Sequence, residues 1–93
     1  MTDDFTKLYK KVRRKYNRNK AEWDDREGFR AFYLKGKMIS VVDMEETKKR
    51  QENNQGEYNT QGYKYNVMSD KLPAYPCNTH EEVFEAIDKK MKE

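Results

Sequence analysis

Cysteine and histidine each occur once in the 93-residue chain, proline twice and glycine four times. A lone cysteine cannot close a disulfide within the chain, and one cysteine with one histidine falls short of the four ligands of a structural zinc site. The four glycines are isolated from one another, so no glycine-rich loop that cradles phosphates is present. These shortages argue against a disulfide-stabilised domain, a zinc site and a phosphate-binding loop.

Apolar residues are also scarce. They make up 34% of the chain against 40% for Asp, Glu, Lys and Arg, a balance that leans toward disorder. The 13% of aromatic residues supply large buried areas, so we expect one small domain spanning residues 1–93. No apolar run approaches the ~20 residues that span a bilayer, and "MTDDFTKLYKK" has acids where a signal peptide starts with bases. The sequence therefore predicts a cytoplasmic protein without a membrane partner.

Positive charge is abundant at the N-terminus. Residues 1–20 hold eight bases and two acids, hence +6; residues 21–46 hold four bases and seven acids, hence −3; residues 47–93 hold eight of each. The stretch "KLYKKVRRKYNRNK", residues 7–20, contains no acid. The basic excess of the chain is thus concentrated in one segment, and such asymmetry bears on partners rather than on fold.

Two helices are predicted, one at each end. In the first, from residue 3 to about residue 20 with Thr2 as its N-cap, apolar residues recur at helical spacing: Phe5, Leu8, Val12 and Tyr16. The second begins with a capping box formed by Thr79 and Glu82. Its inward stripe consists of Val83, Phe84, Ile87 and Met91.

The residues between these helices predict strands. "FRAFYLKGKMISVVDM", residues 29–44, indicates two strands joined by a tight turn at Lys35-Gly36, and "GYKYNVM", residues 62–68, alternates like a half-buried strand. A short fourth strand at residues 72–75 would lie at an edge because of Pro73 and Pro76. "AEWDDREG", residues 21–28, is expected to form a corner anchored by Trp23. The predicted fold class is α+β: an N-terminal helix, a three- to four-stranded antiparallel sheet, and a C-terminal helix packed on one face.

Residues 45–62, "EETKKRQENNQGEYNTQG", show no apolar period and are rich in Asn, Gln, Gly and charge. Loops of this length are typically functional or mobile. We expect a polar mobile loop or hairpin arm at about 45–62.

The order helix, three strands, helix is similar to that of the double-stranded-RNA-binding domain. That family places lysines at the start of its last helix to hold phosphates, whereas this chain has the acidic "NTHEEVFEAID" there, residues 78–88. The resemblance is one of layout and implies no site residues.

Catalytic chemistry has weak candidates. Cys77 and His80 have Cys-x-x-His spacing just before a helix, where a thiol pKa tends to fall, but neither an orienting group nor an oxyanion hole is indicated. The acidic clusters lie in turns or at helix starts, where solvation and capping explain them. We therefore expect no enzymatic activity, no metal and no cofactor.

The basic helix is the candidate binding site, because like charges at helical spacing repel by a few tenths of a kcal/mol per pair and a solvated helix would intersperse acids. Its bases suit nucleic-acid phosphates or an acidic protein surface; a solvated face offset by Asp24, Asp25 and Glu27 is a third interpretation. The candidate contacts are Lys7, Lys10, Lys11, Arg13, Arg14, Lys15 and Arg18 on the helix, and Lys48, Lys49, Arg50 and Tyr58 on the arm.

The function predicted is that of a small non-enzymatic binding protein that contacts nucleic-acid phosphates through this helix. The alternative is a regulator or inhibitor, of the type carried by phages and mobile elements, that binds an acidic surface of a larger host protein. A homodimer formed by paired strand edges is also possible. Bases could stack on an exposed sheet face formed by Tyr33, Tyr58, Tyr63, Tyr65 and Tyr75, interleaved with Arg30 and Lys64. Tyrosines equally suit a protein-binding surface, and alternating aromatics in a strand more often belong to the core or its border.

Overall fold

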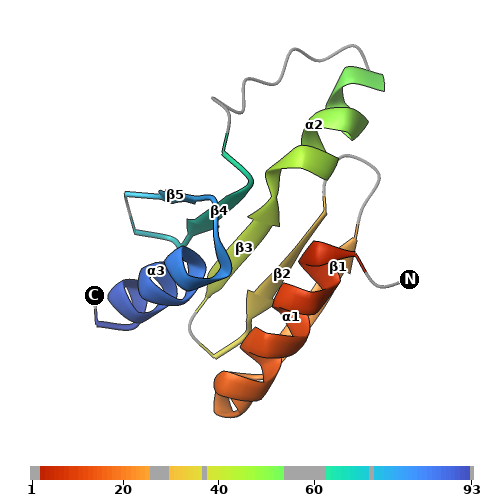
Figure 1. Cartoon of the computed structure of the whole chain (residues 1–93). Coiled ribbons are helices and arrows are strands. Elements are labelled where there is room, and N and C mark those ends of the chain that lie inside the picture. Colours follow the sequence, from red (N-terminus) through yellow and green to blue (C-terminus); the bar gives the residue numbers. More distant parts are fainter. Residues whose placement is uncertain (1–2, 26–29, 37, 54–62, 72, 93) are drawn as a thin grey trace.

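Five antiparallel strands form one sheet in the order β1-β2-β3-β4-β5, and two helices from opposite ends of the chain lie on the same face of it (Figure 1). This computed structural model describes residues 3–25, 30–36, 38–53, 63–71 and 73–92. The elements are α1 (Asp4–Lys15), the 3-10 turn η1 (Asn17–Asn19), β1 (Ala21–Asp25), β2 (Arg30–Leu34), β3 (Ile39–Asp43), α2 (Met44–Asn53), β4 (Tyr65–Met68), β5 (Tyr75–Cys77) and α3 (His80–Lys92).

The α+β class is confirmed, as is an antiparallel sheet whose strands lie between the two terminal helices in the sequence. The sheet has five strands rather than the predicted three or four. Residues 21–25 form β1 rather than a corner, and Trp23 lies opposite Phe32 of β2. The strand was missed because it is acidic, yet an edge strand can carry acids toward solvent. At the other edge, β5 begins at Tyr75 rather than at residue 72 and includes Pro76, which an edge strand tolerates.

The first helix is shorter than expected and has a different N-cap. The Asp3 carboxylate accepts a hydrogen bond of 2.8 Å from the backbone N–H of Thr6. The N-cap is therefore Asp3 and not Thr2, which the sequence predicted. At the other end, Tyr16 leaves helical geometry. Lys20 then adopts a left-handed conformation with φ of 49°, which redirects the chain into β1.

A third helix, α2, occupies the first part of the segment expected to be a loop or arm. Asp43 accepts a hydrogen bond from the N–H of Glu46 at 3.2 Å, and Met44 and Thr47 are buried. Because only a few of its residues meet the sheet, the segment shows no apolar period. Residues 54–62 lie outside the described part. With α2 between β3 and β4, the layout shared with the double-stranded-RNA-binding domain does not hold.

The core lies between the sheet and the two terminal helices. Its fully buried members include Leu8 and Val12 of α1, Phe32 of β2, Val67 of β4 and Ile87 of α3. Burying a side chain of this size contributes about 1.5–3 kcal/mol.

The inward stripe of α3 differs in part from the expected one. Val83 and Ile87 are buried, whereas Phe84 and Met91 are half-buried. Lys90 takes a buried position because its Nζ donates a 2.6 Å hydrogen bond to the carbonyl oxygen of Lys71.

Two tyrosine hydroxyls fix the orientation of α1. Tyr9 donates to the carbonyl oxygen of Ala21 in β1 at 3.3 Å, and Tyr16 donates to the carboxylate of Asp88 in α3 at 2.7 Å. With one side of α1 fastened to the sheet edge and to α3 in this way, the opposite side faces solvent.

Candidate nucleic-acid interface

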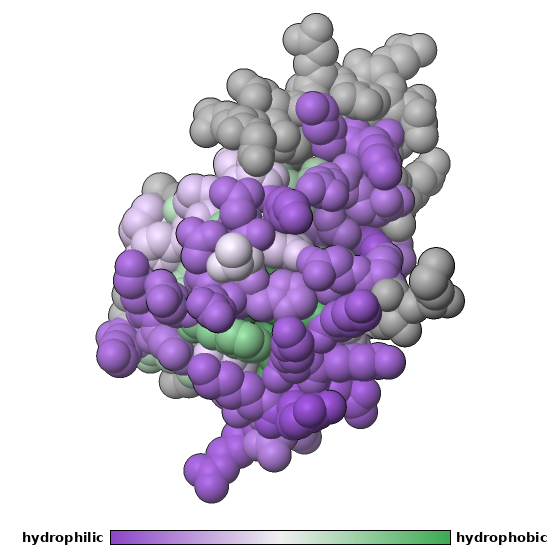
Figure 2. Space-filling model, viewed as in Figure 1, coloured by the Kyte–Doolittle hydropathy of each residue, from purple (hydrophilic) through white to green (hydrophobic). Residues whose placement is uncertain are grey.

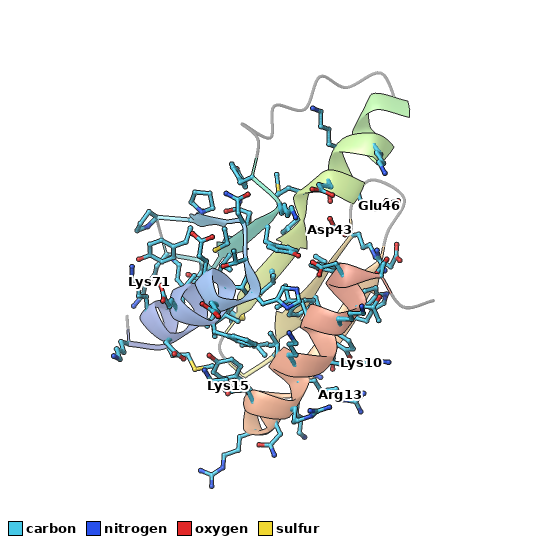
Figure 3. The ribbon with its side chains drawn as sticks, in the orientation of Figure 1. Lys10, Arg13, Lys15, Asp43, Glu46 and Lys71 are labelled. Carbon is cyan, nitrogen blue, oxygen red and sulfur yellow. The ribbon has the colours of Figure 1, made fainter. Side chains whose placement is uncertain are left out.

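The solvent side of α1 carries most of the cations identified in the sequence. With Phe5, Leu8 and Val12 buried, rotation by 100° per residue places Lys7, Lys10 and Arg14 opposite the core, and Arg13 beside them toward β1. We call Lys7, Lys10, Arg13 and Arg14 the basic face; all four are exposed. Lys10 and Arg13 extend away from the ribbon in Figure 3, and hydrophilic side chains cover this region in Figure 2.

Two other predicted contacts on α1 are engaged with α3. Lys11 donates a hydrogen bond of 3.0 Å from Nζ to Nδ1 of His80. Lys15 lies 4.0 Å from a carboxylate oxygen of Asp88, and its Nζ is 4.8 Å from the ring centroid of Phe84. These two lysines therefore lie at the border between α1 and α3, each with a partner on α3, although both side chains stay exposed.

The four cations of the basic face pair with no carboxylate of the described residues. Arg18, exposed in η1 just after the end of α1, is likewise unpaired among the described residues. Of the acids expected to offset this charge, Asp25 lies 3.9 Å from Nε of Arg30 instead. Glu27 lies outside the described residues, and Asp24 alternates to the other face of β1 from Trp23. The opening helix thus presents uncompensated positive charge.

Arg30 holds the N-terminal end of α1 in place. Its side chain is only 14% exposed. Nη1 lies 2.5 Å from a carboxylate oxygen of Asp3 and 3.6 Å from one of Asp43, and Nη2 donates to Thr6 Oγ1 at 3.2 Å. No local pattern predicted this cluster, because its members are far apart in the chain: the register of β2 with β3 brings Arg30 beside Asp43, and the packing of α1 on the sheet adds Asp3 and Thr6.

These contacts shift the carboxyl pKa values in opposite directions. The hydrogen bond from Arg30 holds the pKa of Asp3 well below its usual range, and the Tyr65 hydroxyl, which donates to Asp4, lowers the pKa of Asp4. Burial raises the pKa of Asp43, although Arg30 and the N–H of Glu46 counteract that rise.

These pKa shifts make the free energy of unfolding depend on pH in the acidic range. A carboxyl with a lowered folded pKa contributes stability above its unfolded pKa of about 4, and this contribution is lost as the pH falls through the folded value. We expect the free energy of unfolding to decrease from about pH 5 to about pH 3, with Asp43 offsetting part of the loss. Urea unfolding across this range measures the slope. The Asp3→Asn variant should show a flatter dependence, and an unchanged slope would contradict the assignment to Asp3.

Lys48 and Lys49, the predicted arm contacts whose side chains the structure describes, do not join the basic face. Lys48 and Lys49 are exposed on α2, and Arg50 belongs to the same helix. Lys49 lines a cleft of about 340 Å³ between the starts of α1 and α2, whose other walls include Asp4 and Glu45. In Figure 1, α2 projects beyond the end of α1 that carries the acids, and Tyr58 lies outside the described residues.

The tyrosines that the structure describes do not form an exposed platform on the sheet. Tyr65 is buried, and its hydroxyl donates a hydrogen bond to the carboxylate of Asp4. Tyr33, Tyr63 and Tyr75 are half-buried, and the register places Tyr33 on the opposite face from Tyr75. Tyr33, Tyr63, Tyr65 and Tyr75 therefore take core or half-core positions rather than one exposed stacking face.

Cys77 and His80 do not form a nucleophilic pair. Cys77 is 2% exposed, and burial raises the pKa of its thiol to about 11, the reverse of the shift expected at a helix start. Lys11 can only donate to the Nδ1 atom of His80, so Nε2 carries the hydrogen and donates to Asp4 at 3.1 Å. Within the described residues, His, Cys, Asp and Glu side chains form no group of three or more able to hold a metal ion.

Trp23 is the surface residue whose position the sequence did not reveal. It projects from β1 toward α1 and remains 37% exposed.

The described part of the chain has no helix with the length and apolarity needed to cross a membrane. Comparison of the chain with protein-family models, curated proteins and solved structures found no match.

Proposed function

We propose that the protein binds nucleic acid through the basic face of α1, without catalysing a reaction. The observation that carries this proposal is the absence of acids paired with Lys7, Lys10, Arg13 and Arg14 within the described residues. Holding such cations together costs repulsion energy, and phosphates offset that cost by neutralising the charges and releasing counterions.

The composition of the basic face favours phosphates over an acidic protein surface. Stable protein interfaces are centred on buried aromatic or apolar anchors surrounded by a polar rim. The centre of the basic face consists instead of Lys7, Lys10 and Arg14, without an apolar side chain among them. Contacts of this kind position a phosphate backbone and read little sequence.

The neighbouring helix limits where the backbone can lie. α3 exposes Glu81, Glu85 and Asp88, on the same face of the sheet as α1 (Figure 1). Phosphates are repelled by these carboxylates. The β1 side of α1 carries Arg13, and although β1 is acidic too, Glu22 lies 3.4 Å from Lys35 and Asp25 lies 3.9 Å from Arg30, which offsets part of that charge. The nucleic acid is therefore expected to follow α1 on its β1 side.

The salt dependence of binding tests this proposal. If the basic face and Arg18 contact five phosphates, the logarithm of the association constant should fall with the logarithm of salt concentration, with a slope of about −3.5 for single strands and about −4.5 for duplex. Fluorescence anisotropy of labelled oligonucleotides between about 50 and 200 mM salt measures this slope.

Two outcomes would overturn the proposal. One is undetectable binding at the lowest salt concentration. The other is capture of one stoichiometric protein from nuclease-treated extract by a chain that binds no oligonucleotide, which would favour the regulator of an acidic host protein.

A further inference from the structure

Trp23 exposes an aromatic ring beside the basic face. Among the described residues, it and Met38 are the large hydrophobic side chains that remain exposed, at 37% and 67%. Met38 belongs to the β2–β3 turn, where exposure is ordinary, and has a positive φ of 56°. Trp23 instead lies in the middle of β1 on the face that α1 covers, so its exposure is a property of the surface where the strand and helix meet.

The indole is held in place from three sides. The ring centroid of Trp23 lies 5.6 Å from that of Phe5 and 5.1 Å from that of Tyr9, which meets it edge-on at 65°. The guanidinium carbon of Arg30 lies 4.9 Å from its centroid. A ring held in this way loses little conformational freedom when a ligand stacks on its exposed part.

Tyr9 links Trp23 to the cations. Arg13 follows Tyr9 by one helical turn, and side chains on a helix lean toward its N-terminus, so Arg13 extends back toward Tyr9. Lys10 lies next to Tyr9 on the solvent side. Tyr9 therefore lies between the exposed indole, which it contacts with ring centroids 5.1 Å apart, and these two cations of the basic face.

We propose that the ligand is single-stranded nucleic acid, with one base stacked on Trp23 while Lys10, Arg13 and Arg14 contact the adjacent phosphates. Proteins that bind single strands combine a basic track with aromatic rings in this way. A duplex offers the phosphates but keeps its bases paired and stacked, out of reach of a ring on a strand edge. This inference rests on the proposed function and adds the class of nucleic acid.

Trp23 is the single tryptophan of the chain, so its intrinsic fluorescence reports directly on stacking. We would titrate the protein with an oligothymidylate of about 12 nucleotides and with a duplex of equal length at about 50 mM salt. The single strand should quench the fluorescence to saturation and bind at least about tenfold more tightly than the duplex. The duplex should leave the fluorescence nearly unchanged.

Two variants complete the experiment. Trp23→Ala should lower single-strand affinity by about tenfold or more and leave duplex affinity within about twofold. The matched control Met38→Ala removes the other exposed hydrophobic side chain and should change neither affinity. If Trp23→Ala unfolds, Trp23→Phe keeps a smaller stacking ring and should give an intermediate loss.

The outcomes separate this inference from the proposed function. Salt-dependent binding with equal affinities for single strand and duplex, or without quenching by the single strand, overturns the role of Trp23. The proposal that the basic face binds nucleic acid would still hold. Failure to bind either form overturns both. Quenching and preference for the single strand, both reduced by the Trp23 substitutions, support the inference.

Discussion

Replacing Lys10 and Arg14 with glutamate should lower the affinity for nucleic acid by about 100-fold or more at about 100 mM salt. Each substitution removes a phosphate contact and places a carboxylate where a phosphate approaches, and like charges forced together cost several kcal/mol. Both residues are exposed on the solvent side of α1, away from the core, so the fold should be retained. Anisotropy titrations at fixed salt measure the loss, and circular dichroism checks the fold.

The control is a pair of lysines elsewhere on the surface. Lys71, before β5, and Lys92, at the end of α3, are exposed, and Lys71 lies far from Lys10 in Figure 3. Their double replacement by glutamate changes the net charge by the same amount. A local site predicts a loss of less than about tenfold for this pair, reflecting only the long-range field. Equal losses for the two pairs would show that net charge alone governs binding.

The Arg30→Ala variant should lower the free energy of unfolding by about 3 kcal/mol, because it leaves the nearly buried Asp43 carboxylate without its countercharge. The side chain of Asp43 is 12% exposed, whereas that of Asp3 is 52% exposed, so most of the loss comes from Asp43. The rings of Phe5 and Trp23 also lose a cation within 5.5 and 4.9 Å. Urea unfolding followed by circular dichroism gives the change.

The comparison variant is Lys35→Ala. Lys35 lies 3.4 Å from a carboxylate oxygen of Glu22, but its side chain is 65% exposed, so its loss should cost less than about 1 kcal/mol. The Arg30→Lys variant keeps the charge without the planar fork and should fall between the two. If Arg30→Ala costs no more than Lys35→Ala, the buried ion pairs contribute nothing net to stability.

Local sequence patterns predicted some parts of this fold and not others. The spacing of Phe5, Leu8 and Val12 predicted α1, and Thr79 with Glu82 predicted the start of α3, because both signals act within one or two helical turns. The capping box is present: Thr79 Oγ1 accepts the N–H of Glu82 at 3.1 Å. The Lys35-Gly36 turn between β2 and β3 was likewise predicted, from Lys-Gly placed between two runs of aromatic and β-branched residues.

The misses share a physical cause. β1 is stabilised by hydrogen bonds to β2 rather than by an apolar pattern of its own, and α2 is anchored by Met44 and Thr47 rather than by a stripe. For the site, charge predicted the cations, but only the packing of α3 shows that Lys11 and Lys15 are engaged. The exposure of Trp23 depends on tertiary contacts with Tyr9 and Arg30, which no local pattern encodes.

The two outer strands of the sheet bear on whether copies of the chain associate. An unpaired strand edge invites addition of a strand from another molecule, the first step of many aggregates. In the described part of the chain, β1 carries Glu22, Asp24 and Asp25, and β5 contains Pro76, which has no N–H to donate. Two β1 strands brought together repel each other, and β5 offers an incomplete ladder. We therefore expect these two edges to be poor sites for strand-to-strand dimerisation, which sedimentation at several protein concentrations would measure.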